Sequence, residues 1–457
     1  MHFVHRPYIP KETIAAIATP LGEGGIAVIR VTGAMALSVV EKIFSGPIHT
    51  YQTHTAHLGK ITDLDHRLID EALVLVMLGT RSFCGEDTVE IHCHGGSIVS
   101  RKVLDAVLSA GARAAQPGEF SFKAFMNGKM DLVQAEALQE LIGAKNEIAL
   151  RQAEEQLQGS LSKKIASFQN ELFDIAAILE AWVDFPEEGL EFASKEELLS
   201  SLTSTLRDMQ SLSNTFEEGQ VMKQGLSLCL IGPPNAGKSS LMNTLLGKER
   251  AIVTDIPGTT RDILEDDLLL GGLHFRIKDT AGIRNTEEAI EKEGIRRSKK
   301  AMASADLILL VFDITQKLTE AEEDLLAAAP ESKTLIVWNK ADLPHQNPRT
   351  TPCPSIEISA KTNAGIHELK NAIHKIIWKK GPPSQEEIIL TNVRHKQALD
   401  NATQATLSVI NGLESDLSPE FIASDMRRIL TELGTIIGRD INEDILGAIF
   451  SKFCVGK

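Results

Sequence analysis

Cysteine is scarce in this sequence and forms no pattern of structural use. The five cysteines are odd in number, scattered, and without the CxxC spacing of a zinc or redox site; they are Cys84, Cys93, Cys229, Cys353 and Cys454. A disulfide framework needs paired cysteines in an oxidising compartment. The cysteine pattern therefore predicts a chain that works in a reducing compartment.

Long apolar runs are missing as well. The longest, LVLVML at 73–78 and LILLVF at 307–312, have the length of a strand, whereas a membrane-spanning helix needs about 20 apolar residues. The opening residues, MHFVHRPYIPK, lack the apolar core of a signal peptide. We therefore expect a cytoplasmic protein without a membrane segment.

An excess of positive charge is the third absence. Lys and Arg number 47 against 62 for Asp and Glu, which gives a formal charge of −15. Because diffuse binding to a phosphate backbone depends on Lys and Arg, any nucleic-acid contact must be local or supplied by a partner. The 457 residues suffice for about two to four domains with buried cores.

The spacing of apolar residues changes along the chain. The first 125 residues mix strand-like runs, GIAVIRV and EALVLVML, with the helix-like SIVSRKVLDAVLSAG, which is typical of a small α+β domain. From about 130 to 185 apolar residues recur every three or four positions, as in a helical bundle; they include Leu150, Ala153, Leu157, Leu161, Ile165, Phe168, Leu172, Ile175, Leu179 and Trp182.

A different pattern occupies residues 226–380. Short apolar strands alternate with helix-like stretches, which predicts a doubly wound parallel α/β domain; the strands are SLCLIG, HFRIKD, DLILLVFD, TLIVWNK and SIEIS. After Gly-Pro-Pro at 381–383 the helical spacing returns. We predict an α/β domain inserted into an α-helical domain and preceded by a small α+β domain, with borders 1–125, 126–223, 224–379 and 380–457.

The stretch GPPNAGKSS, Gly232 to Ser240, has the context of a phosphate-binding P-loop. It follows the apolar LSLCLI and precedes the helix-like SLMNTLLG. In such a loop backbone N–H groups surround the β-phosphate at a helix N-terminus. Lys238 then reaches the β- and γ-phosphates, and the Ser239 hydroxyl binds Mg²⁺.

Two further motifs indicate a guanine base. In NKAD, which follows TLIVW, the Asp342 carboxylate can accept from the N1–H and the exocyclic amine of guanine, a donor pair that adenine lacks. SAK at 359–361 ends the next strand and can bring N–H groups to the guanine O6. NKAD alone would fit a solvated turn equally well.

The switch motifs lie between these two groups. DTAG suits a Mg²⁺ shell at Asp279 and a γ-phosphate donor at Gly282. TDIPGTTRD supplies Thr260 as the threonine that closes on Mg²⁺. Ile283 stands where Ras-like signalling proteins carry the glutamine that orients water.

Four motifs in this order predict a Ras-like G domain that binds GTP. Its expected nucleotide contacts are Asn235, Ala236, Gly237, Lys238, Ser239, Ser240, Thr254, Asp255, Ile256, Pro257, Gly258, Thr259, Asp279, Thr280, Ala281, Gly282, Asn339, Lys340, Ala341, Asp342, Ser359, Ala360 and Lys361.

These motifs, together with the terminal FCVGK, resemble the MnmE (TrmE) family of tRNA-modification GTPases. The resemblance continues in ATPLGEGGIAVIRVTG, CGEDTVEIHCHGG, GARAAQPGEFSFKAFMNGKMDLVQAEAL and WVDFPEE, so it spans the chain. It implies hydrolysis without a switch glutamine or an arginine finger. The G domains would dimerise, and K⁺ would neutralise charge that develops on the phosphates. The matching K⁺ ligands are Asn235, Thr254, Ile256 and Thr259.

The resemblance also assigns a water-positioning carboxylate to Glu291. From the residues alone Glu287, Glu288 and Glu293 compete for that role, because 285–300 is rich in charge and typical of a solvated helix face.

A folate site is implied in the N-terminal domain, which the resemblance also makes a dimerisation domain. Residue matching gives Arg30, Glu90, Lys129 and Lys457 for 5-formyl-tetrahydrofolate as one-carbon donor. Cys84 departs from the threonine common in relatives. The tail cysteine, Cys454, is implied in the modification chemistry, although a bare sequence would make it an incidental thiol near a frayed end.

The implied reaction adds an aminomethyl or carboxymethylaminomethyl group to the wobble uridine of tRNA. The implied assembly is a homodimer with the FAD-dependent partner MnmG. One alternative is a ribosome-assembly GTPase of the Era or Der type, although a single P-loop followed by helices disfavours it. Another is a GTP-gated assembly module without chemistry.

The stretch HCHGG at 92–96 gives only a weak signal of a metal site. His92 and His94 would share one strand face, but no second cluster of ligands accompanies them.

Overall fold

The computed structural model describes most of the chain, and the description covers residues 9–20, 22–184, 194–247, 267–270, 273–278, 302–344, 351–378, 387–439 and 441–456. The chain divides into two compact units. The first comprises Met1–Ile142, Glu154–Met209 and Gln397–Lys457, and the second Gly143–Ala153 and Gln210–Lys396.

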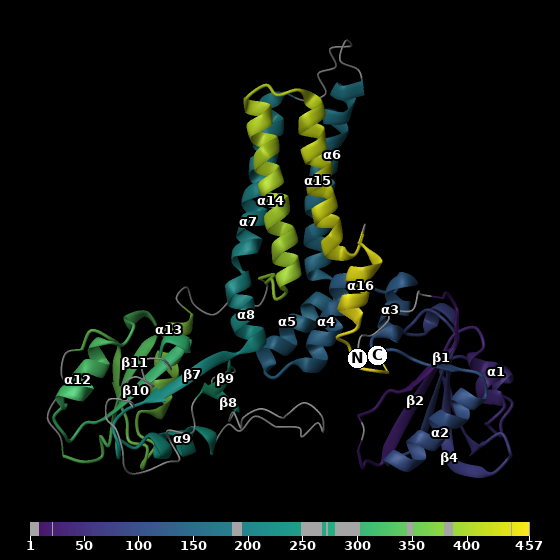
Figure 1. Ribbon diagram of the computed structural model, residues 1–457, viewed down its shortest axis with the longest axis horizontal. Helices are drawn as coiled ribbons and strands as arrows, with labels where there is room; N and C mark the ends of the chain where they lie inside the picture. Colours follow the sequence, from purple (N-terminus) through teal and green to yellow (C-terminus); the bar gives the residue numbers. More distant parts are fainter. Residues whose placement is uncertain are drawn as a thin grey trace. The chain divides into compact units, whose positions relative to one another are not determined.

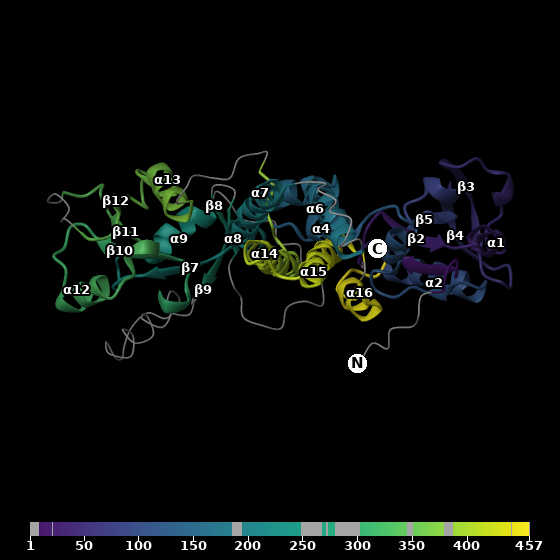
Figure 2. The ribbon, with the colours of Figure 1, turned by 90° about the horizontal axis from the view of Figure 1, so that it is seen from above.

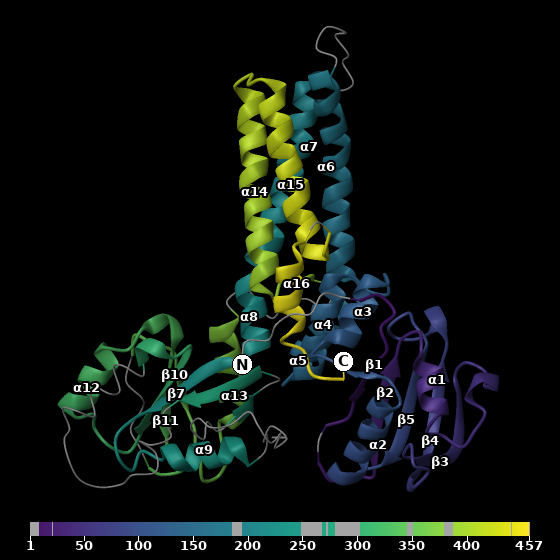
Figure 3. The same ribbon diagram turned by 45° about the vertical axis from the view of Figure 1, so that its right-hand side comes forward.

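The first unit contains a six-stranded sheet in the order β3-β4-β5-β2-β1-β6. Helices α1 (Ala36–Glu41) and α2 (Ser97–Ser109) pack on one face, where Val103 and Val107 meet Ile29 of the sheet (Figure 3). Since side chains alternate along a strand, Arg30 and Glu90 lie on the other face. The strands are β1 (Ile14–Ile17), β2 (Ile26–Thr32), β3 (Thr55–Thr62), β4 (Leu68–Met77), β5 (Thr88–His94) and β6 (Arg113–Ala114).

Helices make up the rest of the first unit. The long helices α6, α7, α14 and α15 run alongside one another (Figures 1 and 2). The helices are α3 (Glu119–Met126), α4 (Leu132–Gly143), α5 (Glu147–Leu157), α6 (Ser160–Asp184), α7 (Lys195–Asn214), α14 (Val393–Glu414), α15 (Pro419–Ile437) and α16 (Glu443–Phe450). Parts of α5, α7 and α14, and the last residue of α4, belong to the second unit.

The helical spacing seen in the sequence becomes the buried stripe of α6. That stripe consists of Leu161, Ile165, Phe168, Leu172, Ile175 and Leu179. Leu150, from the same run, lies on the separate helix α5 and is 38% exposed. Among the described helices, none has the length and apolar character needed to cross a bilayer.

The second unit contains a sheet in the order β12-β11-β10-β7-β9-β8. The five strands predicted from the sequence pair in parallel as expected, and β8, which was not predicted, adds an antiparallel edge beside β9. Only Gly271 and Gly272 separate the two strands in the sequence, and so short a connection suits antiparallel neighbours. The strands are β7 (Leu226–Ile231), β8 (Asp267–Leu270), β9 (Leu273–Lys278), β10 (Leu307–Asp313), β11 (Thr334–Asn339) and β12 (Ser355–Glu357).

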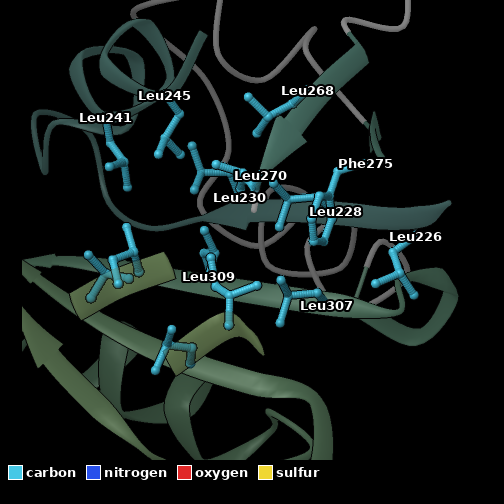
Figure 4. Packing of buried hydrophobic residues seen from close by; sticks show 14 of the residues in the cluster. Leu226, Leu228, Leu230, Leu241, Leu245, Leu268, Leu270, Phe275, Leu307 and Leu309 are labelled. Carbon is cyan, nitrogen blue, oxygen red and sulfur yellow. The ribbon is translucent and has the colours of Figure 1, made fainter. Parts of the chain in front are cut away.

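Both faces of this second sheet are covered. Helices α9 (Lys238–Leu246) and α13 (Ile366–Ile377) pack on one face, and α12 (Glu320–Ala327) packs on the other. Leucines of β7, β8, β10 and α9 and Phe275 of β9 belong to one buried cluster between the sheet and the helices α9 and α13 (Figure 4). Every residue of β7, β10 and β11 is buried, as parallel strands between two helical layers require.

The order of elements confirms the predicted fold class. The α/β domain is inserted between helices α8 (Phe216–Gln224) and α14, and the α+β domain precedes both. The exact domain borders remain predictions.

Candidate functional site

The loop between β7 and α9 has the backbone of a phosphate cradle. Asn235 and Gly237 have positive φ angles of 62° and 91°, which turn the chain sharply before the helix begins at Lys238. A Cβ at Gly237 would lie 2.1 Å from Asn339 Nδ2, so only glycine fits there. The backbone N–H groups at the N-terminus of α9 can therefore face an anion, as they do in P-loops.

The Lys238 ammonium lies over this loop. Its Nζ donates to the carbonyls of Gly232 and Pro233, each at 2.7 Å. Burial lowers the pKa of Lys238. The two carbonyls hold the ammonium with the partial negative charge that phosphate oxygens would supply more strongly. Ser239, the next residue, is exposed in the first turn of α9, where its hydroxyl is accessible to Mg²⁺.

Asn339 links the P-loop to the loop after β12. Its Nδ2 donates to the Ala236 carbonyl at 2.9 Å, and its Oδ1 accepts from the Ala360 N–H at 3.0 Å. Thr244 of α9 donates to the Ala360 carbonyl at 2.9 Å. The P-loop, NKAD and SAK motifs are thus brought together. Thr244 was missed, because a helix threonine carries no signal of such a role.

The Asp342 carboxylate is exposed but oriented. Ser359 Oγ donates to its Oδ1 at 2.7 Å, and the same Oγ accepts from the Thr362 N–H at 3.1 Å. Ser359 therefore orients the carboxylate that would bind the base, and the other Asp342 oxygen, Oδ2, can accept from a further donor.

Arg30 and Glu90 form a second cluster, on the open face of the first sheet. They are register partners on β2 and β5, and Arg30 Nε and Nη2 each lie 2.8 Å from Glu90 Oε1. The Arg30 guanidinium also lies 5.7 Å from the ring centres of both Phe83 and Phe120. Lys129 donates to the Thr80 carbonyl at 2.7 Å.

The chain end docks beside this cluster. Arg30 Nη1 donates to the Gly456 carbonyl at 3.3 Å, and the Gly118 N–H donates to the Cys454 carbonyl at 3.3 Å. Gln139 Nε2 donates to the Lys452 carbonyl at 3.0 Å. The ordinary expectation of a frayed end is therefore wrong here, and Cys454 is held with its side chain exposed.

Cys84 lies near Arg30, but it is buried and is not a reactive thiol. It is fully buried, with its Sγ 3.4 Å from the Phe120 carbonyl. Burial raises the pKa of the Cys84 thiol to about 11, although Thr32 and Arg30 oppose the rise. The thiol is therefore neutral near pH 7.

His92 and His94 share a strand face but bind different carboxylates. His92 Nε2 lies 3.3 Å from Glu90 Oε2, and His94 Nδ1 lies 2.8 Å from Asp70 Oδ1. Within the described stretches, no group of three or more His, Cys, Asp or Glu is arranged to hold a metal.

Several predicted site residues lie outside the described stretches. They are Thr254, Asp255, Ile256, Pro257, Gly258, Thr259, Thr260, Asp279, Thr280, Ala281, Gly282, Ile283, Glu291 and Lys457.

Comparison with known proteins gives matches along the whole chain. Residues 13–129 match the model of the GTP-binding protein TrmE N-terminus, and residues 132–454 match the model of the MnmE helical domain. The tRNA modification GTPase MnmE of Protochlamydia amoebophila is 60% identical over 461 residues, covering 100% of both chains. That of Chlamydia trachomatis serovar L2 (strain ATCC VR-902B / DSM 19102 / 434/Bu) is 45% identical, covering 98% of this chain and 99% of the relative.

A solved structure, the G domain of the T. maritima FeoB iron transporter, is 24% identical. It covers 33% of this chain and 98% of its own, with a TM-score of 0.25.

Proposed function

Because the chain belongs to the MnmE (TrmE) family of tRNA modification GTPases, and so hydrolyses GTP, we propose that K⁺ and G-domain dimerisation stimulate this hydrolysis. We further propose that hydrolysis drives addition of an aminomethyl or carboxymethylaminomethyl group to the wobble uridine of tRNA, together with the FAD-dependent MnmG. Family membership removes the ribosome-assembly alternative.

The Asn339 contacts carry the GTP part of this proposal. One side chain joins the P-loop at Ala236 to the N–H of Ala360, and Asp342 stands three residues further on. Asn339 thereby fixes the P-loop relative to the loops that carry Asp342 and Ala360. Among our proposed nucleotide contacts, Lys238 binds the β- and γ-phosphates, Ser239 binds Mg²⁺ with Thr260, and Asp342 binds the base.

Asn235 supports the K⁺ part. It lies exposed in the P-loop with a positive φ, so its amide oxygen can face a cation beside the phosphates. We assign the remaining K⁺ contacts to Thr254, Ile256 and Thr259. K⁺ bound there would supply the positive charge that an arginine finger supplies elsewhere. Glu291 would orient the attacking water.

The Arg30–Glu90 cluster supports the folate part. A carboxylate suits the donor edge of an aminopyrimidine, and guanidinium or ammonium groups suit the glutamate carboxylates of 5-formyl-tetrahydrofolate. Phe83, which lies beside Arg30 and is partly exposed, can stack against a planar ring. We assign Lys129 and Lys457 to the same pocket. Cys454, docked nearby and exposed, is our candidate for the thiol that adds to the uridine.

The open face of the first sheet supports a homodimer through the N-terminal domain. Leu58 and Leu73 are register partners there, and they are 66% and 46% exposed. Apolar side chains paired on a sheet face favour a covering partner. We propose that a second copy of the chain covers this face. The other proposed partners are MnmG and tRNA. We also propose that the protein works in the cytoplasm, which agrees with its five free cysteines.

GTP turnover in KCl and in NaCl at equal ionic strength tests the proposal. We expect at least about tenfold faster turnover in KCl, because the cation offsets transition-state charge. The Asn235→Ala protein should lose most of that difference while still binding GTP through Lys238. Equal wild-type rates in both salts would refute the K⁺ assignment.

Replacement of Arg30 by alanine tests the folate site. The loss of a charge-assisted pair should lower wobble modification by roughly 10- to 100-fold, measured by mass spectrometry of tRNA nucleosides with MnmG present. Binding of 5-formyl-tetrahydrofolate, measured by calorimetry, should weaken in parallel. Arg101→Ala, on the exposed side of α2, is the matched control. Unchanged folate binding would contradict the assignment, and unchanged tRNA in the wild type would favour an assembly module without chemistry.

A further inference from the structure

We propose that Asp313, the last residue of β10, is a positioning residue for guanine-nucleotide binding, because it holds the Lys340 side chain of NKAD in place before the nucleotide arrives. The proposal rests on GTP as the ligand of this domain and adds a residue to that site. Asp313 carries no motif of its own. Its only sequence signal is an acidic residue directly after a buried apolar run.

The contact between the two side chains is short and sheltered. Lys340 Nζ lies 2.6 Å from Asp313 Oδ2, and the side chains are 32% and 8% exposed. The other carboxylate oxygen, Oδ1, accepts from the Thr315 N–H at 3.0 Å and from Thr315 Oγ1 at 2.7 Å. Both oxygens of Asp313 therefore have donors, so the carboxylate cannot rotate freely.

The backbone brings the pair together. Asp313 and Asn339 are register partners on the parallel strands β10 and β11, and the Ile314 N–H donates to the Asn339 carbonyl at 3.0 Å. Lys340 follows with φ of 69°, a left-handed value that is uncommon for a residue with a side chain. Such a conformation persists only where surrounding contacts hold it, and the ion pair with Asp313 is one such contact.

The charges agree with this geometry. Burial of Asp313 opposes ionisation, but the donors Lys340 and Thr315 outweigh burial and lower the pKa of the carboxyl group. The Asp313 carboxylate is thus ionised at neutral pH. A half-buried ion pair of this kind contributes orientation as well as attraction.

Lys340 stands between two residues of the candidate site. Asn339 precedes it and holds the P-loop, and Asp342 follows it as the candidate base reader. Asp313 also lines a pocket with Pro233, Pro234 and Asn235 of the P-loop. Lysine has large rotamer freedom, so ordering it at the moment of binding would weaken affinity. Asp313 removes that freedom in advance, which is preorganisation of the nucleotide site.

A double-mutant cycle on the full chain tests this role, with a fluorescent GDP analogue as the probe. We expect Asp313→Asn to raise the Kd of the analogue about tenfold, as loss of a charge-assisted contact would. Lys340→Met should have a similar effect, and the double variant should be no weaker than the weaker single variant. In turnover, the loss in Asp313→Asn should fall mainly on KM for GTP, because preorganisation acts on binding.

The controls separate positioning from folding. Asp324→Asn, an exposed carboxylate on α12, should leave the Kd unchanged. Asp313→Glu, which keeps the charge, should recover part of the affinity. Additive effects in the cycle, or an unchanged Kd in Asp313→Asn, would overturn the proposal. Failure of the wild-type chain to bind the analogue would instead refute the GTP site itself.

Discussion

Replacement of Asp342 by asparagine will move the base preference of this enzyme from guanine toward xanthine. The carboxylate is exposed and accepts from the Ser359 hydroxyl at 2.7 Å, so it would meet the base in a defined orientation. Guanine offers two donors on one edge, which pair with two carboxylate oxygens. Asparagine offers one acceptor and one donor, and that pattern suits the carbonyl that xanthine has in place of the exocyclic amine.

The expected effect is large because a mismatched polar edge loses two contacts at once. We expect kcat/KM for GTP to fall roughly 10³-fold, while turnover of XTP rises above that of GTP. Steady-state phosphate release with each nucleotide measures both.

Ser359→Ala provides a graded control for this specificity change. It removes only the hydroxyl that steers the carboxylate, so its loss should be about tenfold or less and its preference for guanine should persist. An Asp342→Asn protein that still turns over GTP as fast as wild type would remove Asp342 from the base site.

Lys238→Ala should produce the second large effect. The Lys238 ammonium already lies over the P-loop, bound to the carbonyls of Gly232 and Pro233. Charge that develops on the transferred phosphoryl group needs a donor placed beforehand, and removal of one such donor costs about 10²- to 10³-fold in kcat. We therefore expect GTP turnover to fall by that factor, both in the chain alone and in the presence of MnmG, the proposed partner.

Phosphate release at saturating GTP and K⁺ measures this loss. Lys375→Ala, an exposed lysine on α13, changes the net charge by the same amount and should turn over GTP normally. A turnover within a factor of about three of wild type in Lys238→Ala would be far less than loss of a transition-state donor predicts.

Local patterns in the sequence were enough to predict the fold class, the parallel strands of the second sheet and the helical spacing of α6. The apolar runs of β7, β10 and β11 and the apolar stripe of α6 were recognisable because the local geometry of a strand or a helix fixes which neighbouring side chains are buried. The P-loop and NKAD motifs were recognisable because a phosphate cradle and a base reader need particular residues at close spacing. The antiparallel β8 was missed, although Gly271 and Gly272 before β9 were a readable signal.

The sequence by itself therefore determined the fold class, the family and the nucleotide, since each rests on motifs or periods whose residues are near one another in the chain. Only the tertiary structure decided that Arg30 meets the Gly456 carbonyl 426 residues away, and that Asp313 holds Lys340. Periodicity and motif spacing describe one segment at a time. Contacts between distant segments depend on how strands pair and where a chain end docks, and those are set by packing over the whole unit.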